Sequence, residues 1–331
     1  MHIMKKHINV LLILDSKPGH KNITLGFAAF FEKNYKTSIQ SISVPLYFSR
    51  LGKILQYIWP LGSTVFSSLL RKIIQTDQDY DLIIASGGNT LYSCASLSKT
   101  TGAKSIFVGR KRKLPIESVT MFAHFDEDLA SHGYTIFDYF PSNQTKLRSE
   151  NCLENDVAFL FGGDSKEIRW TKSDLLFICD FMEKLLTNTD SQLSISTSRR
   201  TSIESELLLS SFFEEKYIKD SCWVHQGDRR NIVHDYLSSA RVLCVSGDSI
   251  SMLHECLNHE KPVICFLPNT MNRNNRHLRH LDDLCNKGFI YVQQTTEPID
   301  FEELGKYLTL KKDIERKQKK TDMLLYDLIQ K

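Results

Sequence analysis

The sequence predicts two doubly wound α/β domains in series, each built on a parallel sheet. The chain has 331 residues, more than one ordinary domain holds. Short apolar runs alternate with segments of helical period, and these runs are rich in β-branched residues, as strands covered on both faces require. A polar stretch with a proline at 141–155 interrupts the alternation. We therefore expect domains at 1–145 and 146–331, with a last helix that crosses back to the first domain as an alternative.

The expected strands and helices alternate along both halves. In the first half, strands are predicted at 8–14, 38–44, 81–85, 104–108 and 118–123, with helical segments at 22–33, 47–75 and 89–100. In the second half, strands are predicted at 156–161, 192–197, 221–224, 241–246 and 262–267, with helices at 172–187, 202–215, 229–239, 249–258 and 275–287. The tail from 300 to 330 is expected to be a charged helix. Ligands of open parallel sheets bind outside the carboxyl ends of the strands, so candidate functional residues are sought directly after each strand.

The charge is shared unevenly between the two halves. Residues 1–150 hold 18 Lys and Arg against 11 Asp and Glu, a net +7, and residues 151–331 hold 24 against 28, a net −4, which together give the +3 of the chain. A basic first half suits anionic lipid, a phosphorylated acceptor or nucleic acid. The near-neutral total and the lack of a recognised nucleic-acid motif argue against nucleic acid.

The cysteines and the start of the chain indicate a cytoplasmic protein. Eight cysteines occur singly, without a CxxC pair, and several lie inside apolar runs. We expect buried, reduced thiols and no zinc site. The basic residues 1–6 precede a short apolar run that ends at Asp15 without a cleavage site, so a first strand is favoured over a signal peptide. No apolar stretch approaches the roughly 20 residues of a membrane span.

The loop after the first strand carries a candidate base. Pro18 and Gly19 predict a tight turn, and the next helix is expected to begin near Asn22. An imidazole at a helix start can take a proton from a hydroxyl, so His20 is the candidate base, with Asp15 at the strand end to orient or replace it. The alternative is a turn histidine without a chemical role.

Two further loops of the first half contain glycines and basic residues. Gly87 and Gly88 follow the third strand, where they allow close approach of a ligand or tight packing of a helix. A basic run of residues 110–112 follows the fourth strand, and Arg110 is the best placed of these for an anion. The alternative is a solvated loop.

Three polar loops recur at strand ends of the second half. Backbone N–H groups beside glycines, arginine pairs and helix N-termini all suit a diphosphate. The alternatives are a plain N-cap at Ser202 with solvated arginines, and a capped helix with an exposed Glu255. The candidate residues are Gly163, Asp164, Ser165, Lys166, Arg169, Ser198, Arg199, Arg200, Gly247, Asp248, Ser249, Ser251 and Glu255.

The strings DSKPGH, FGGDSKEIRWT, TSRRT and GDSISMLHE resemble those of the mitochondrial-fission-protein family, which includes a plant organelle-division factor and bacterial relatives. The resemblance runs from Asp15 to the final helices. That family is similar to GT-B glycosyltransferases, and its nearest functional analogue is the MurG-type transferase. Gly19 and His20 match the end of the MurG glycine-rich loop, although with fewer glycines. Ser246, Gly247 and Glu255 match its nucleotide loop, although Glu255 lies further from the Ser-Gly pair.

The resemblance implies two Rossmann-like domains with a cleft between them that binds a sugar nucleotide. It implies transfer of a sugar from a nucleotide donor to an envelope glycan or a lipid-linked acceptor, with the nucleotide in the second domain and the acceptor, beside Gly87, Gly88 and Arg110, in the first. No cofactor or metal is expected, because GT-B enzymes usually need none. The alternative is a non-catalytic GT-B-like scaffold that recruits a division or fission partner. The residues expected to stabilise the leaving diphosphate are Ser198, Arg199, Gly247 and Ser249.

Residues 47–72 mix aromatic and basic side chains and are interrupted at Pro60-Leu61-Gly62. This composition is typical of a segment at the surface of an anionic membrane, which would make the protein peripheral at the inner face of the membrane. The alternative is a helix packed on the sheet.

Overall fold

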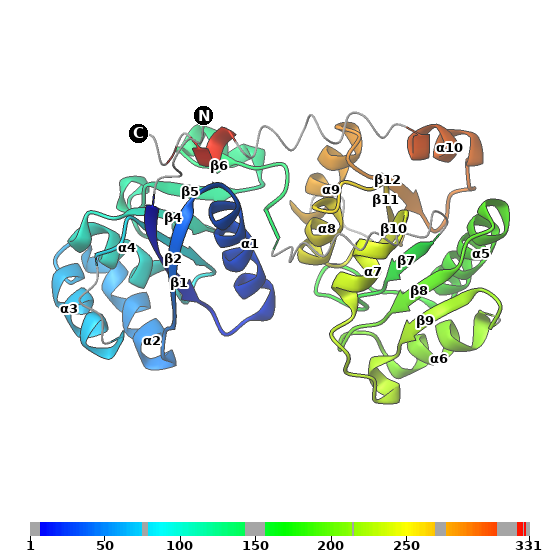
Figure 1. Ribbon diagram of the computed structural model, residues 1–331, viewed down its shortest axis with the longest axis horizontal. Helices are drawn as coiled ribbons and strands as arrows, with labels where there is room; N and C mark the ends of the chain where they lie inside the picture. The colour runs from blue at the N-terminus through cyan, green and yellow to red at the C-terminus, as the bar shows by residue number, and fades with distance from the viewer. Residues whose placement is uncertain are drawn as a thin grey trace. The chain divides into compact units, whose positions relative to one another are not determined.

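A computed structural model describes residues 7–74, 79–142, 156–213, 215–268, 276–309, 323–326 and 328 (Figure 1). The chain forms two compact units, Met1–Gln144 with Lys319–Lys331, and Thr145–Gln318. Each contains one parallel sheet of six strands, so the predicted α/β class is confirmed. The predicted boundary at 141–155 lies almost wholly outside the described residues, as do residues 1–6 and Cys152.

The sheet of the first unit has the strand order β2-β1-β3-β4-β5-β6, and every neighbouring pair is parallel. Its central strands β3 and β4 are buried at every position except Lys104 at the start of β4, which explains their continuous apolar runs. The strands are β1 (His7–Leu14), β2 (Lys36–Ser43), β3 (Leu82–Ser86), β4 (Lys104–Val108), β5 (Met121–His124) and β6 (Thr135–Ile136).

Helices cover both faces of this sheet (Figure 1). One face packs against α1 through Phe27 and Phe31, and the other packs against α2, α3 and α4 through Phe48, Phe66 and Tyr92. The helices are α1 (Pro18–Asn34), α2 (Leu46–Leu55), η1 (Gln56–Ile58), α3 (Ser63–Ile74), α4 (Leu91–Thr101), η2 (Ile116–Ser118) and η3 (Glu127–His132).

The last described residues pack on the first unit. Leu325 and Leu328 are buried among the side chains of the α1 face, and the Tyr326 hydroxyl donates a hydrogen bond of 2.6 Å to Oδ1 of Asn34. Residues 310–322 of the expected charged tail helix lie outside the described residues. The chain therefore ends against the unit in which it begins.

The sheet of the second unit has the order β12-β11-β10-β7-β8-β9, again with only parallel pairs. Phe159, Phe181 and Phe266 form the centre of the core on its α5 face. The strands are β7 (Val157–Leu160), β8 (Leu193–Ser196), β9 (Ile218–Cys222), β10 (Val242–Ser246), β11 (Val263–Leu267) and β12 (Tyr291–Gln294).

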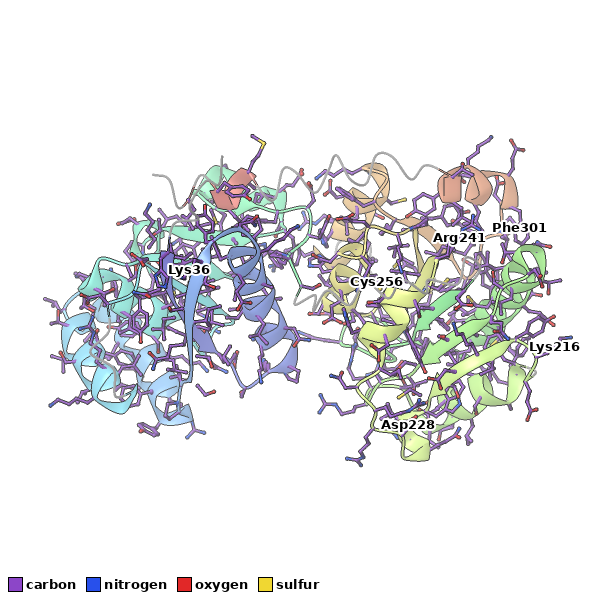
Figure 2. All side chains as sticks on the ribbon, in the orientation of Figure 1. Lys36, Lys216, Asp228, Arg241, Cys256 and Phe301 are labelled. Atoms are coloured by element: carbon purple, nitrogen blue, oxygen red, sulfur yellow. The ribbon has the colours of Figure 1, made fainter. Side chains whose placement is uncertain are left out.

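The helices of this unit also lie on both faces of its sheet (Figure 1). Helices α5, α6 and α10 contribute to one core, and α7, α8 and α9 follow on the other side. Cys256 of α8 points into this unit and is fully buried (Figure 2). The described cysteines are free thiols, all buried except the half-buried Cys285. The helices are α5 (Lys172–Thr189), α6 (Ile203–Phe212), η4 (Val224–Gln226), α7 (Val233–Ser239), α8 (Ile250–Leu257), α9 (Arg276–Asn286) and α10 (Phe301–Thr309).

Several predicted element bounds were wrong. The first helix begins at Pro18 rather than near Asn22, because proline fits the first helical position, where its missing N–H is not needed. The predicted strand at 221–224 lies at 218–222, since the edge strand β9 is half-exposed and lacks a continuous apolar run. The predicted strand at 118–123 begins at Met121. Strands β6 and β12 were not predicted.

Among the described residues, no helix has both the length and the apolar character needed to cross a bilayer. Residues 47–72 form α2, η1 and most of α3, and their inner side packs on the sheet as one alternative predicted.

Candidate functional site

The first unit has a topological switch between β1 and β3. These strands are neighbours in the sheet, but the helices that follow them, α1 and α4, lie on opposite faces. The two loops therefore diverge at the carboxyl edge of the sheet, which is where ligands of open α/β sheets bind. This edge brings together the predicted residues Asp15, His20, Gly87 and Gly88.

Asp15 and His20 form a hydrogen-bonded pair at this edge. The pair is 2.7 Å apart between Oδ2 of Asp15 and Nδ1 of His20, and the Asp15 side chain is 1% exposed against 35% for His20. Asn89 Nδ2 and the Ser16 hydroxyl donate to the other carboxylate oxygen at 3.0 and 3.3 Å. Burial alone would raise the pKa of Asp15, but the hydrogen bonds from His20 and Asn89 and the nearby imidazole lower it below its usual value.

The donor and the acceptor of the hydrogen bond between Asp15 and His20 can be assigned. An ionised carboxylate only accepts hydrogen bonds, so Nδ1 of His20 carries the proton. The neutral ring then presents Nε2 as an acceptor, which is the arrangement in which a carboxylate orients a histidine base. Because α1 begins at Pro18, His20 lies in the first turn of the helix, and its carbonyl accepts from the Thr24 hydroxyl at 3.1 Å.

Gly87 and Gly88 pack directly against functional side chains. A Cβ on Gly87 would lie 2.1 Å from Nδ1 of His20, and Gly87 has φ +86°, which disfavours other residues. A Cβ on Gly88 would lie 1.9 Å from Nη2 of Arg112. Arg110, the basic residue favoured from the sequence, instead pairs with Asp126 at 3.4 Å.

The second unit has its own switch between β7 and β10, which are neighbours followed by α5 and α8 on opposite faces. The Ser246 hydroxyl joins the two strand ends: it accepts from the Gly162 N–H at 2.7 Å and donates to Oδ1 of Asp248 at 2.5 Å. A Cβ on Gly162 would lie 2.2 Å from the other Asp248 oxygen. A glycine is therefore required at this contact.

Asp248 is a buried carboxylate paired with an exposed arginine. Its side chain is 0% exposed, and Nη2 of Arg200 lies 2.7 Å from its Oδ2. Burial raises the pKa of Asp248, while the Ser246 hydroxyl and the Arg200 charge oppose this rise. The contact ties the loop after β8 to the loop after β10.

The loop after β8 is also tied to the loop after β7. The Ser198 hydroxyl donates to the Gly162 carbonyl and accepts from the Arg200 N–H at 3.0 Å. Gly163, at φ +102°, forms an isolated parallel β-bridge with Arg200. A Cβ on Gly163 would lie 2.4 Å from the Arg200 carbonyl oxygen. Three strand ends thus form one hydrogen-bonded site with glycine backbone and a guanidinium at its surface.

Several predicted residues of the first polar loop make hydrogen bonds within the loop. Asp164 pairs with Arg169 at 3.0 Å and accepts from the Trp170 N–H. The Ser165 hydroxyl accepts from the N–H groups of residues 167 and 168. Lys166 is exposed. Ser202 caps α6 by accepting from the Ser205 N–H, as the alternative expected, but of the two arginines that it expected to be solvated, Arg199 is exposed and Arg200 pairs with Asp248.

Helix α8 presents its N-terminus at the β7–β10 switch. Ser249 is its N-cap residue, and no side chain among the described residues caps the helix there. The Gly247 carbonyl lies 2.5 Å from Nε2 of His277, whose pKa is lowered mainly by burial. Ser251 and Glu255 lie one helix turn apart on α8, both half-buried. The uncapped helix N-terminus can bind an anion.

Some residues of these sites were not predicted. Asn89 and Gly162 each stand beside a predicted glycine, so a closer reading of the Gly-Gly pairs would have found them. Arg112 belongs to the predicted basic run 110–112, in which Arg110 was preferred, whereas His277 comes from a distant segment that no local pattern marks. Among the described residues, no cluster of three or more His, Cys, Asp or Glu side chains is arranged to hold a metal ion.

The fold is shared with solved structures of low sequence identity. A putative UDP-N-acetylglucosamine 2-epimerase from Listeria monocytogenes has a TM-score of 0.55 at 11% identity, covering 94% of this chain and 90% of that one. The UDP-GlcNAc 2-epimerase of Methanocaldococcus jannaschii has a TM-score of 0.50 at 12% identity, covering 92% of both chains. E. coli ADP-heptose LPS heptosyltransferase II has a TM-score of 0.49 at 13% identity, covering 91% of this chain and 98% of that one. The two epimerases show that the fold is of the GT-B type.

No curated protein matches the sequence. The sequence pattern of the family described as Mitochondrial fission ELM1 matches residues 142–310, slightly more than half of the chain. This segment spans all three polar loops of the second unit. The resemblance predicted from the loop motifs is confirmed, and the chain belongs to the Mitochondrial fission ELM1 family.

Proposed function

We propose that the protein is a glycosyltransferase that moves a sugar from a nucleotide donor to an envelope glycan or a lipid-linked acceptor. The observation that carries this proposal is the Asp15–His20 pair at the switch point of the first sheet, with Nε2 of His20 presented as a proton acceptor. A hydroxyl acceptor must lose its proton as it attacks the sugar, and an oriented imidazole supplies that step.

The second unit supplies the groups expected for a nucleoside diphosphate. Gly162 and Gly163 let a ligand approach the backbone after β7, Arg200 is held at the surface by Asp248, and α8 presents an uncapped N-terminus. Together these are preorganised donors that stabilise the negative charge of a leaving diphosphate without a metal. Nucleotide-binding proteins of the same fold, such as the Methanocaldococcus UDP-GlcNAc 2-epimerase, are consistent with such a ligand.

We further propose that the outer side of α2, η1 and α3 contacts an anionic membrane. This side exposes large apolar residues: Tyr47, Ile54, Tyr57, Ile58, Leu61 and Val65 are each more than half exposed. No acidic residue occurs from 33 to 76, whereas Arg50, Lys53, Arg71 and Lys72 lie in α2 and α3. Apolar and aromatic groups with basic neighbours suit a lipid interface and the acceptor expected there.

Calorimetry of the intact protein with UDP, CMP and GDP in the presence of a chelator tests the donor site. We expect one of these to bind with a dissociation constant of about a millimolar or less, and its sugar nucleotide to release that same nucleotide when glycolipid acceptor is added. No heat with any nucleotide contradicts the enzyme and favours a scaffold that recruits a division partner. Nucleotide binding without transfer to any acceptor supports the donor site and contradicts the transferase activity.

A further inference from the structure

The loop after β4 holds an arginine in an unusual conformation. Arg112 has φ +54°, a left-handed backbone that residues other than glycine seldom adopt and that costs of the order of 1 kcal/mol or more. The surrounding contacts impose it. The Lys111 N–H donates to the Tyr134 hydroxyl at 2.8 Å, the Leu114 N–H donates to the Lys111 carbonyl at 3.0 Å, and Leu114 is fully buried.

This conformation places the guanidinium against the glycine pair of the first site. A Cβ on Gly88 would lie 1.9 Å from Nη2, 2.5 Å from Cζ and 2.8 Å from Nε of Arg112. The preceding residue, Gly87, stands in the same relation to His20. Consecutive Cα atoms are about 3.8 Å apart, so the imidazole and the guanidinium pack on adjacent residues of one turn.

Among the described residues Arg112 has no hydrogen-bond or ion-pair partner, unlike Arg110 and Lys111 before it. Arg110 pairs with Asp126, and the Lys111 ammonium donates to the Leu114 carbonyl at 3.1 Å. Within the described part of the chain, no carboxylate lies within ion-pair distance of Arg112. The nearby Asp15 oxygens already accept from His20, Asn89 and Ser16. The guanidinium therefore keeps its donors for an external anion.

A second positive group lies at the same turn. Helix α4 begins at Leu91, directly after the Gly87–Thr90 turn, and no described side chain caps it, because the Thr90 hydroxyl donates to the carbonyls of Ser86 and Gly87 instead. Its first turn contains no acidic residue. The positive end of the helix dipole thus adds to the arginine.

We propose that Arg112 binds a phosphate group of the acceptor, beside the hydroxyl that His20 deprotonates. This inference rests on the proposed transfer reaction and narrows its acceptor to a phosphorylated glycan or lipid. The planar guanidinium matches two phosphate oxygens, and a third oxygen faces the start of α4. Arg112 is here a substrate-binding residue, and its imposed backbone conformation fixes the phosphate relative to Nε2 of His20.

The test uses the intact protein with isotope-labelled histidine, titrated with inorganic phosphate at constant pH and ionic strength. The imidazole resonance of His20, assigned by its loss in His20→Gln, reports binding at this site and not at the nucleotide site. We expect saturable shifts in the wild type and in Arg110→Ala, which removes the same charge two residues earlier. Arg112→Ala should weaken phosphate binding at least about tenfold. Arg112→Lys keeps the positive charge but not the two parallel N–H donors of the guanidinium, so it should also weaken binding.

A wild-type His20 resonance that does not saturate with phosphate overturns the inference, as do equal losses in Arg110→Ala and Arg112→Ala. If Arg112→Ala fails to fold, Arg112→Lys decides by the same readout. Calorimetry with nucleotides is independent of this experiment. If nucleotide binds but the His20 resonance does not respond to phosphate, only the phosphate site is contradicted. If the His20 resonance responds but no nucleotide binds, only the proposed transferase activity is contradicted.

Discussion

The buried carboxylate of Asp248 lies 2.7 Å from Nη2 of Arg200, although the two residues follow different strands of the second sheet. A buried charge without a partner is costly, so this contact holds the guanidinium in place. The Arg200 side chain as a whole remains 41% exposed. Arg200 is therefore a donor already positioned before any ligand arrives, which is what stabilisation of a leaving diphosphate requires.

We predict that Arg200→Ala weakens nucleoside diphosphate binding by about 1.5–3 kcal/mol, the contribution of a hydrogen bond to a charged group. Arg199→Ala should cost less because no carboxylate among the described residues holds Arg199 as Asp248 holds Arg200, and Lys111→Ala, in the other unit, should cost only a few tenths of a kcal/mol. Calorimetry on the three variants measures this order. Equal losses for Arg200→Ala and Lys111→Ala would show that the diphosphate does not bind at this loop.

A control is needed because Arg200→Ala also leaves Asp248 buried without its cation. The double variant Arg200→Ala/Asp248→Asn removes that charge, so its melting temperature should recover towards the wild type while nucleotide binding stays weak. Recovery of both properties together would mean that Arg200 acts only through stability.

We predict opposite effects of adding a methyl group at two glycines of the second unit. Gly162→Ala places a Cβ 2.2 Å from the Asp248 carboxylate, so it should displace Asp248, lower the melting temperature and weaken nucleotide binding. Gly305→Ala lies within α10 with open space around it and should stabilise the protein by about 0.5–1 kcal/mol. Thermal melting of both variants checks this. A wild-type melting temperature for Gly162→Ala would contradict the close contact.

The parallel strands were predictable because burial on both faces leaves a local signal. Val242–Ser246 is buried at every position and was predicted within one residue. Strand β12 was missed because it lies at the edge of the sheet, where half-buried polar residues suffice, as in Tyr291–Gln294. The position of the sites was also predictable, since the carboxyl ends of parallel strands share one edge.

The pairing of residues within each site was not predictable. The loops that carry Arg200 and Asp248 meet because β7 lies between β8 and β10, and strand order leaves no mark in the local sequence. Arg112 packs against Gly88 in a loop whose backbone is held at Lys111 by Tyr134, more than twenty residues later. Long-range packing therefore decided which member of each basic run contacts the neighbouring loops.

We predict that apolar-to-acidic changes on α2 and in the turn between η1 and α3 abolish binding to anionic vesicles. Ile54→Glu and Leu61→Glu remove side chains that are 67% and 84% exposed and add negative charge to a segment that has basic but no acidic residues. Folding should be unaffected, because these side chains face solvent. Matched changes on α6, Ile203→Glu and Leu207→Glu, alter side chains of the other unit that are 57% and 55% exposed and should leave binding intact.

Flotation of the intact chain with vesicles at low and high salt measures this. Binding should fall with salt, since each basic residue near an anionic surface contributes about 1 kcal/mol that screening reduces. Salt-independent binding, or its loss in the α6 variants, contradicts the assignment.

We predict that the second unit loses stability as the pH falls from about 6.5 to 4. Burial, together with the charges of Lys261 and His234, lowers the pKa of His259 to about 4. In the unfolded chain a histidine titrates near 6.5, so within this window the unfolded state binds a proton that the folded state does not, and acidification favours unfolding. His259→Gln should narrow the difference in melting temperature between pH 7 and pH 5. The exposed His132→Gln is the control, and an equal narrowing in both variants would exclude His259 as the cause.

We predict finally that His20 is the catalytic base and that Asp15 orients it. The lowered pKa of Asp15 keeps its carboxylate ionised at neutral pH, and the 2.7 Å contact keeps the proton of His20 on Nδ1. Removing a general base costs roughly 10²–10⁴ in turnover, so His20→Ala should lose that much with nucleotide affinity nearly unchanged. Asp15→Asn keeps the shape of the side chain but offers an amide, which can face Nδ1 with either its oxygen or its nitrogen, and should lose turnover by a smaller factor.

Turnover and nucleotide affinity must therefore be measured together for both variants. The nucleotide site belongs to the other sheet, and a loss of affinity in His20→Ala would mean that the change spreads beyond the loop after β1. If His20→Ala keeps near-full turnover and Asp15→Asn is inactive, the base is Asp15, and the imidazole only supports its charge. If both variants keep turnover, the loop after β1 has no chemical role. The pair would then be a structural contact at the start of α1, and the first unit would serve only to bind the acceptor.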